Sequence, residues 1–248
     1  MRLCENLYIV GSGEYGISHR YDCSIYLVDT GDEMIMVDSG CGIEPERIVR
    51  NIEAEGLDPQ RLAAVFLTHC HYDHAGGASF FHKEFGTDIY VSSVDVDLLI
   101  SGTDEGIGLC SAKRSGIFDS DSHFSNCEEA IPLNDSDCFT FGGLSLRVIG
   151  VRGHSPGSVC FRVSVGDFDG LFTGDTLLAN GAIGLLNMDG SSLKDFRDYL
   201  PKLENESSDA LLPGHGVFTL SNAYEHVVKA LEALKNLAVP RSMQGLVT

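Results

Sequence analysis

The chain has 248 residues with a formal net charge of −19, and 43% of its residues are hydrophobic. This length allows one large domain or two small ones, and the hydrophobic fraction suffices for a buried core. The acidic balance, without a cluster of Lys and Arg, argues against a nucleic acid as partner. There is no apolar run long enough to cross a membrane and no signal peptide after Met1, so we expect a cytoplasmic protein without a membrane partner.

The N-terminal part of the sequence predicts strands that alternate with helices. Asp29 to Asp32 read Asp-Thr-Gly-Asp between two apolar runs, which is typical of a β-hairpin. Pro45 near its start and Gly56 at its end delimit a helix with one apolar face. Residues 11–20 form a glycine-rich loop without the spacing of a phosphate-binding loop. We expect strands at residues 3–10, 23–28, 34–37, 63–67 and 88–91, and helices at 45–55, 75–85 and 94–100.

The C-terminal part predicts a meander of strands followed by helices. Residues 101–137 are rich in Ser, Gly, Asp and Asn and predict an irregular segment that is either a lid or a disordered insertion. Ser192 is a predicted N-cap for the first of the two helices. We expect strands at residues 138–141, 144–151, 159–165, 170–172 and 210–212, and helices at 192–203 and 223–237. Because the candidate ligands described below extend from His69 to His215, we expect a single domain over residues 1–248.

The eight cysteines include no Cys-x-x-Cys pair, and a chain of this length needs no disulfide to stabilise its core. We therefore expect free thiols. Cys23, Cys138 and Cys160 lie in predicted apolar strands, where a free thiol packs as a small hydrophobe. Cys70 lies between two histidines, and we expect it to pack rather than to bind a metal.

Three imidazoles and one carboxylate occur within six residues, directly after the apolar run at 63–67. These residues are His69, His71, Asp73 and His74. A loop that leaves a rigid strand end can turn several side chains toward one point, and neutral imidazole and carboxylate are ligands of borderline divalent metals. The cluster predicts a metal site, and a polar surface loop rich in histidine is the alternative.

Three further ligand-type residues follow predicted strands. Each of them has a glycine beside it, so that the backbone can approach a ligand closely. They are His154 in Gly-His-Ser-Pro-Gly, Asp175 in Thr-Gly-Asp-Thr and His215 in Pro-Gly-His-Gly. One zinc ion typically takes four ligands, so seven predict two divalent metal ions. Zinc suits the imidazoles, and iron and manganese remain alternatives.

The order His-x-His-x-Asp-His, then His, Asp and His, resembles the metallo-β-lactamase superfamily in its wide hydrolase sense. Val-Asp-Ser-Gly at residues 37–40 also looks like the early loop of that family, which contains an Asp. The resemblance implies an α/β (α+β) fold, built as a four-layer αββα sandwich with the metals at one edge. It implies ligands shared as follows: His69, His71 and His154 on one ion, Asp73, His74 and His215 on the other, and Asp175 bridging both.

The implied chemistry is that of a metallo-hydrolase acting on a small molecule. A hydroxide held between two metal ions would attack a carbonyl or phosphoryl centre. Asp73 and Asp38 are the predicted catalytic carboxylates. Asp38 would act through hydrogen bonds that orient a ligand or the water. The alternative for Asp38 is a turn residue that binds nearby backbone amides.

The Thr-His-x-His-x-Asp-His-x-Gly-Gly and Gly-Asp-Thr-Leu motifs resemble the glyoxalase II-like thioester hydrolases. The best-known β-lactamases usually have Cys where Asp175 stands, acyl-homoserine lactonases Tyr where Leu178 stands, and flavo-diiron proteins Glu where His71 stands. We therefore expect an ester or thioester substrate, although the stretch after His215 is too short for the usual glutathione-binding tail. The alternatives are a persulfide dioxygenase-like protein with one iron on His69, His154 and Asp175, a lactonase, a phosphodiesterase, and a metal-binding scaffold.

Several other polar residues have two interpretations. Tyr15 and His19 lie in a loop that often borders the active site in the resembled family, so they are either substrate contacts or part of a solvated loop. Lys113 and Arg114 form the only adjacent basic pair. They would contact an anionic substrate group or remain a solvated pair, and His123 is open in the same way.

Overall fold

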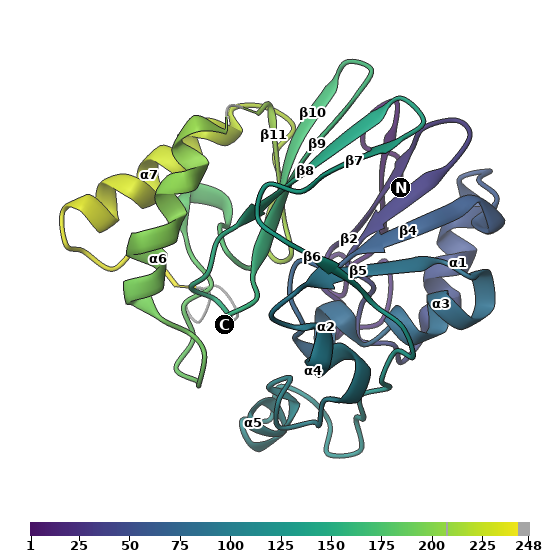
Figure 1. Cartoon of the computed structure of the whole chain (residues 1–248), viewed down its shortest axis with the longest axis horizontal. Helices are drawn as coiled ribbons and strands as arrows, with labels where there is room; N and C mark the ends of the chain where they lie inside the picture. Colours follow the sequence, from purple (N-terminus) through teal and green to yellow (C-terminus); the bar gives the residue numbers. More distant parts are fainter. Residues whose placement is uncertain (207, 243–248) are drawn as a thin grey trace. The chain divides into compact units, whose positions relative to one another are not determined.

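The computed structural model describes residues 1–206 and 208–242. The chain divides into two compact units, each with its own sheet. Unit 1 contains residues 1–133 and 141–143, and unit 2 contains residues 134–140 and the described residues from 144 onward. Figure 1 shows the course of the chain through both units.

Unit 1 contains a six-stranded sheet in the order β1-β2-β3-β4-β5-β6. Its strands are β1 (Leu7–Gly11), β2 (Ile25–Asp29), β3 (Met34–Val37), β4 (Leu62–Phe66), β5 (Asp88–Ser92) and β6 (Ile131–Leu133). The first three strands pair antiparallel, whereas β3, β4, β5 and β6 are parallel to one another. Parallel neighbours end at the same edge of a sheet, so the loops that follow β3, β4 and β5 leave side by side.

The helices of unit 1 bury apolar side chains against this sheet. They are α1 (Pro45–Ala54), α2 (Tyr72–Ala75), α3 (Ala78–Phe85), α4 (Val96–Ser101) and α5 (Leu109–Arg114), with a short 3₁₀ helix, η1 (Pro59–Arg61). Ile48 and Ile52 of α1 and Phe81 of α3 are fully buried with Val65 and Ile89 of the strands. Figure 1 shows α1 and α3 beside the strands of this sheet. The apolar face predicted for α1 is therefore the face that forms the core.

Unit 2 contains a five-stranded sheet in the order β11-β10-β9-β8-β7. Its strands are β7 (Cys138–Phe141), β8 (Leu144–Gly150), β9 (Val159–Val165), β10 (Phe168–Gly174) and β11 (Ala210–Pro213). Strands β8, β9 and β10 form an antiparallel meander, and β11 lies parallel to β10. Because β10 and β11 are parallel, the residues that follow them leave the sheet at one edge.

Two α-helices cover one face of the sheet in unit 2. They are α6 (Leu193–Tyr199) and α7 (Ala223–Lys235), accompanied by the 3₁₀ segments η2 (Ala179–Gly181) and η3 (Leu200–Asn205). Phe196 of α6 and Val227 of α7 share a buried cluster with Ile149 and Leu171 of the strands. Figure 1 shows both helices on the same side of this sheet (green and yellow). The predicted N-cap is confirmed, because the Ser192 side chain accepts a hydrogen bond from the Asp195 amide.

The predicted elements are found with four corrections. The first strand begins at Leu7 instead of residue 3, because the chain before it turns and Leu3 N donates to Leu7 O at 2.8 Å. The helix expected at 75–85 is two helices, α2 and α3, that meet at Gly76 and Gly77. The segment 101–137 is not irregular throughout, since it contains α5 and β6.

The fourth correction concerns the thiols. Cys23 and Cys160 are buried, as predicted, but Cys138 is exposed. Cys138 starts β7, a strand at the edge of its sheet whose first residue faces outward. An apolar strand pattern at a sheet edge thus does not ensure burial. Among the residues that the structure describes, no helix is long and apolar enough to cross a membrane.

Candidate metal centre

The loop that follows β4, here called the ligand loop (residues 67–71), carries the first two candidate ligands. Leu67 N donates to Tyr90 O at 2.8 Å, which holds the start of the loop against β5. His71 is the N-cap residue of α2, and its carbonyl accepts from Ala75 N at 2.9 Å. His69 Nε2 and His71 Nδ1 lie 3.1 Å apart. Two imidazoles of one loop therefore direct ring nitrogens to a common point.

His74 lies on α2 between two carboxylates. Its Nδ1 atom is 2.9 Å from Asp38 Oδ2, and its Nε2 atom is 3.8 Å from Asp73 Oδ2. The hydrogen bond to Asp38 places the proton of a neutral imidazole on Nδ1, so the Nε2 lone pair faces Asp73. A carboxylate behind the ring nitrogen is the usual arrangement for a histidine that binds a metal.

Asp38 also connects His74 to His69 through Thr68. Asp38 Oδ1 accepts from the backbone N of Thr68 at 2.8 Å, and the Thr68 hydroxyl lies within 3.0 Å of both carboxylate oxygens. The same hydroxyl is 3.0 Å from Nδ1 of His69. This buried network fixes the orientation of both rings. Thr68 was not among the predicted site residues, although its place directly before the histidine cluster was the available signal.

Glycines allow the loop after β3 to lie directly on α2. Ser39 N donates to His74 O at 2.8 Å, and Gly77 N donates to Gly40 O at 3.0 Å. A Cβ atom at Gly77 would lie 2.1 Å from Ser39 O, which no side chain permits. The Gly-Gly pair of the motif therefore serves this close contact, and it also separates α2 from α3.

Unit 2 brings its three candidate ligands together at strand ends. His154 Nε2 is 3.5 Å from Asp175 Oδ2, and His215 Nε2 is 3.8 Å from Asp175 Oδ1. His154 and Asp175 are buried, whereas His215 is half-buried. The parallel pairing of β10 and β11 places Asp175 and His215 at the same edge, where Gly214 N donates to Gly174 O at 2.8 Å. One carboxylate thus lies between two imidazoles.

Gly184, which was not among the predicted site residues, supports this set. His154 Nδ1 lies 2.6 Å from Gly184 O, so it donates its proton there and directs Nε2 toward Asp175. Gly184 N in turn donates to Asp175 O at 2.9 Å. A Cβ atom at Gly184 would lie 2.1 Å from that oxygen and 2.7 Å from His154 Nδ1. Only glycine fits this position without displacing a candidate ligand.

The residues in both units fit divalent metal ions by the chemistry of their donors. Unit 1 offers three imidazoles and the Asp73 carboxylate, and unit 2 offers two imidazoles and the Asp175 carboxylate. In His69, His74 and His154, Nδ1 lies within hydrogen-bond distance of an oxygen atom. This leaves the lone pair of Nε2 to bind a metal. The two sets lie in different units, and the assignment of ligands to each ion remains a prediction.

The thiols near the ligand loop are buried. Cys23 forms a buried group with Asp38 and His74 whose candidate donor atoms lie within 4.8 Å of one another. Burial raises the pKa of the Cys23 thiol, and burial together with Asp95 raises the pKa of the Cys70 thiol. A raised pKa disfavours the thiolate that a metal or an electrophile requires. Both cysteines therefore behave as packing residues.

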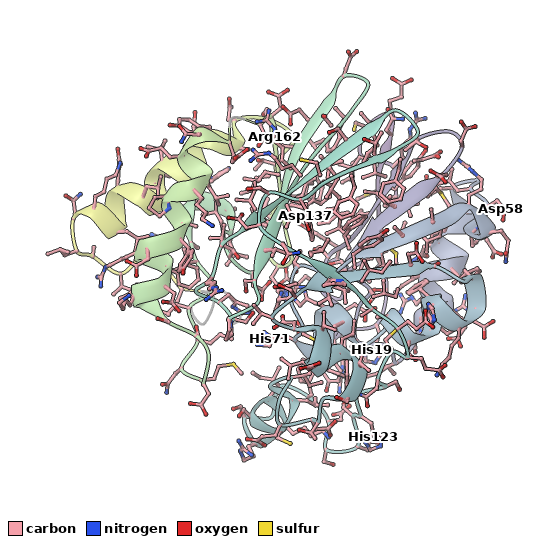
Figure 2. All side chains as sticks on the ribbon, viewed as in Figure 1. His19, Asp58, His71, His123, Asp137 and Arg162 are labelled. Atoms are coloured by element: carbon pink, nitrogen blue, oxygen red, sulfur yellow. The ribbon has the colours of Figure 1, made fainter. Side chains whose placement is uncertain are left out.

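The other residues with open interpretations lie in unit 1. Lys113 binds Asp104 at 2.8 Å and Arg114 lies 3.6 Å from Glu105, so both pair with acidic groups of their own segment. His19 Nδ1 is 3.5 Å from Cys41 Sγ. Tyr15 is exposed, and so is His123, which Figure 2 labels on the segment 101–137.

Comparison with known proteins gives one consistent family. A family model described as "Metallo-beta-lactamase superfamily" matches residues 20–215. An uncharacterized protein of Mycobacterium tuberculosis is 34% identical over 221 residues, which cover 86% of this chain and 93% of that protein. A "Probable polyketide biosynthesis zinc-dependent hydrolase" of Bacillus velezensis is 30% identical over 154 residues, which cover 62% of this chain and 53% of the hydrolase.

Two further similarities concern a thioesterase and a solved structure. An "Atrochrysone carboxyl ACP thioesterase" of Aspergillus fumigatus is 25% identical over 89% of this chain and 58% of its own length. The crystal structure of a subclass B3 metallo-β-lactamase of Bradyrhizobium japonicum superposes with a TM-score of 0.72 at 22% identity, over 96% of this chain and 91% of that chain. The structural likeness confirms the predicted mixed α/β fold with two sheets.

Proposed function

This chain belongs to the metallo-β-lactamase superfamily, and we propose that it hydrolyses an ester or thioester bond in a small molecule. The main support is the set of potential metal ligands in each unit. Unit 1 has converging imidazoles with a carboxylate, and unit 2 has a carboxylate between two imidazoles. A relative named as a zinc-dependent hydrolase and another named as a thioesterase support this class of reaction. The motifs of the sequence favour the glyoxalase II-like branch within it.

We propose two zinc ions as cofactors, held by the seven ligands that the sequence predicts. When bound, such ions supply Lewis acidity and a water molecule whose pKa is lowered to about 7. The ligands are His69, His71, Asp73, His74, His154, Asp175 and His215.

The residues behind the ligands select the tautomer of the neutral imidazoles. Asp38 holds the proton of His74 on Nδ1, and the carbonyl of Gly184 does the same for His154. In this tautomer each ring presents its lone pair at Nε2. A ring in this tautomer can bind a cation through Nε2.

Asp73 and Asp38 have different roles in this proposal. The Asp73 side chain is 18% exposed, whereas that of Asp38 is 2% exposed. Of the two carboxylates, only Asp73 is accessible to a substrate or a reacting water, so it is the one that accepts a proton during catalysis. Asp38 acts on His74 and Thr68.

Elemental analysis of freshly purified protein, combined with a panel of thioester, ester, lactone and phosphodiester substrates, tests the proposal. We expect two zinc ions per chain and turnover of a thioester or ester that stops when a chelator removes the metal. His71→Ala and Asp175→Ala should abolish turnover while leaving the circular dichroism spectrum unchanged. A variant that kept both full activity and full metal content would refute the ligand assignment. If the protein contained a single iron and consumed oxygen with a persulfide substrate, the proposal of a hydrolase would be wrong and the protein would be an oxygenase.

A further inference from the structure

Asp95 begins α4, directly after β5, but its side chain serves another segment. It is the N-cap residue of α4, a position where Asp usually accepts a hydrogen bond from an amide of the first helical turn. Within the described chain, its side chain makes no such capping bond. Its carboxylate instead lies beside the backbone of Cys70, which partly offsets the rise in the carboxylate pKa that burial causes. The side chain is therefore directed at the ligand loop, away from its own helix.

The position of Asp95 mirrors that of Asp38 on the opposite side of the ligand loop. Asp38 follows β3 and Asp95 follows β5, and these strands flank β4, from which the ligand loop emerges. Asp38 accepts from the amide of Thr68, the residue before His69. Asp95 lies beside the backbone of Cys70, the residue after His69. Two buried carboxylates thus lie beside the peptide groups on both sides of one candidate ligand.

The arrangement costs stability, which argues against a purely structural role. Asp95 is 2% exposed, and its Oδ2 atom has no hydrogen-bond partner among the residues that the structure describes. Burial raises the pKa of Asp95 to about 6, because the charged form is poorly solvated. Ser or Thr would cap α4 without burying a charge. A buried carboxylate that destabilises the fold, at a position where Ser or Thr would not, is typical of a functional site.

We propose that Asp95 is a positioning residue of the metal centre, which fixes the ligand loop around His69 together with Asp38. It contacts neither the ion nor the substrate and acts through the backbone of Cys70. The consequence is that the 3.1 Å separation between the ring nitrogens of His69 and His71 is set before a metal binds. This inference rests on the proposed metal-dependent function.

The test compares variants that separate helix capping from loop positioning. D95S supplies a capping oxygen to α4 but no carboxylate for the ligand loop, and D95T does the same with more side-chain volume, should D95S not fold. D95N keeps the side-chain length of Asp95 and one oxygen that can accept a hydrogen bond. The matched control is D58A, because Asp58 is a true N-cap of unit 1 whose side chain accepts from Gln60 N at 3.0 Å. Figure 2 shows Asp58 well separated from His71.

Two measurements are made on metal-free protein: zinc affinity by competition with a chelator, and hydrogen exchange of the Cys70 amide. We expect D95S to lose zinc affinity by about tenfold or more, as for other residues behind metal ligands, and to exchange the Cys70 amide faster. D95N should bind zinc nearly as tightly as the wild type, and D58A should leave both readouts unchanged.

Each contrary outcome has a distinct meaning. D95S with wild-type zinc affinity and wild-type exchange at Cys70 would make Asp95 an ordinary helix cap and overturn the inference alone. An equal loss of affinity in D58A would trace the effect to general destabilisation and overturn it as well. A wild-type protein that binds no zinc would refute the proposed function, and the inference with it.

Discussion

His74 Nδ1 lies 2.9 Å from Asp38 Oδ2, with both side chains buried in unit 1. Asp38 has a φ of +62°, in the left-handed region that short polar residues tolerate better than others. This backbone turns the carboxylate back toward the edge of the sheet, where it meets both Thr68 and His74. The orientation of a candidate ligand on α2 thus depends on one unusual residue after β3.

Replacing Asp38 by Asn should lower zinc affinity by about 10–100-fold while the fold is retained. Asn adopts the same left-handed backbone, but its amide offers one acceptor oxygen where Asp38 uses two. Chelator competition measures the affinity, and circular dichroism monitors the fold. Wild-type affinity in D38N would show that the carboxylate does not orient His74.

Gly184→Ala should abolish activity or reduce it severely, because the added methyl group would overlap Asp175 O and crowd His154 Nδ1. Gly143→Ala is the matched control, since within the described chain a Cβ there meets nothing within 4 Å. Kinetics and zinc content of the two variants provide the comparison. Comparable activity in both would mean that the loop carrying Gly184 moves without disturbing His154.

Phe118→Ala should loosen the segment 101–137 where it packs in unit 1. The Phe118 ring makes edge-to-face contacts with Tyr21 at 4.9 Å and with Tyr72 at 5.2 Å between ring centroids. Because Phe118 is only half-buried, we expect a loss of about 2 kcal/mol in unfolding free energy, less than for a fully buried Phe. Urea denaturation measures this loss, and limited proteolysis should cut the segment faster. Ile117→Ala is the control, because that side chain is 60% exposed and should change neither readout.

Asp95→Asn should stabilise the metal-free protein near neutral pH, even though Asp95 is proposed to serve the metal centre. The pKa of Asp95 is about 6 in the folded chain, whereas the ordinary pKa of an Asp side chain is 3.8. A raised carboxyl pKa means that the folded state binds the proton more tightly, so stability from this group falls as the pH rises from about 4 to 6. Above that window the ionised group costs up to about 3 kcal/mol, which D95N removes.

Urea denaturation of both proteins across pH tests this expectation. The advantage of D95N should be full at about pH 7.5 and roughly halved at about pH 5. A difference between the two proteins that does not change with pH would show that Asp95 is not buried in its charged form.

The strand ends that carry the ligands were predictable because each has a short local sequence pattern, an apolar run followed by a ligand-type residue with a glycine nearby. The residues behind the ligands were not, because their roles depend on contacts across long stretches of sequence. Gly184 matters only because His154 and Asp175 lie against it. Asp95 has the sequence position of a helix cap, and only the fold brings its carboxylate beside Cys70 of the ligand loop.

The segment 101–137 shows the same limit of local patterns. Its composition favours an irregular loop, yet Asp104 receives Lys113 Nζ at 2.8 Å and the Phe124 amide at 3.3 Å. These contacts stabilise a six-residue helix that propensity alone would not sustain. The break between α2 and α3 likewise follows from the approach of Ser39 to Gly77.

Two backbone hydrogen bonds, from Ser39 N to His74 O and from Gly77 N to Gly40 O, join the loop after β3 to α2 and the residues that follow it. They have a consequence for how the protein acquires its ions. An arriving cation finds chain that is already ordered, so little of its binding energy is diverted into organising the backbone. The ligand site should therefore be preformed in the metal-free protein. Zinc should then leave and rebind rapidly, without the unfolding that accompanies the loss of metal from a zinc finger.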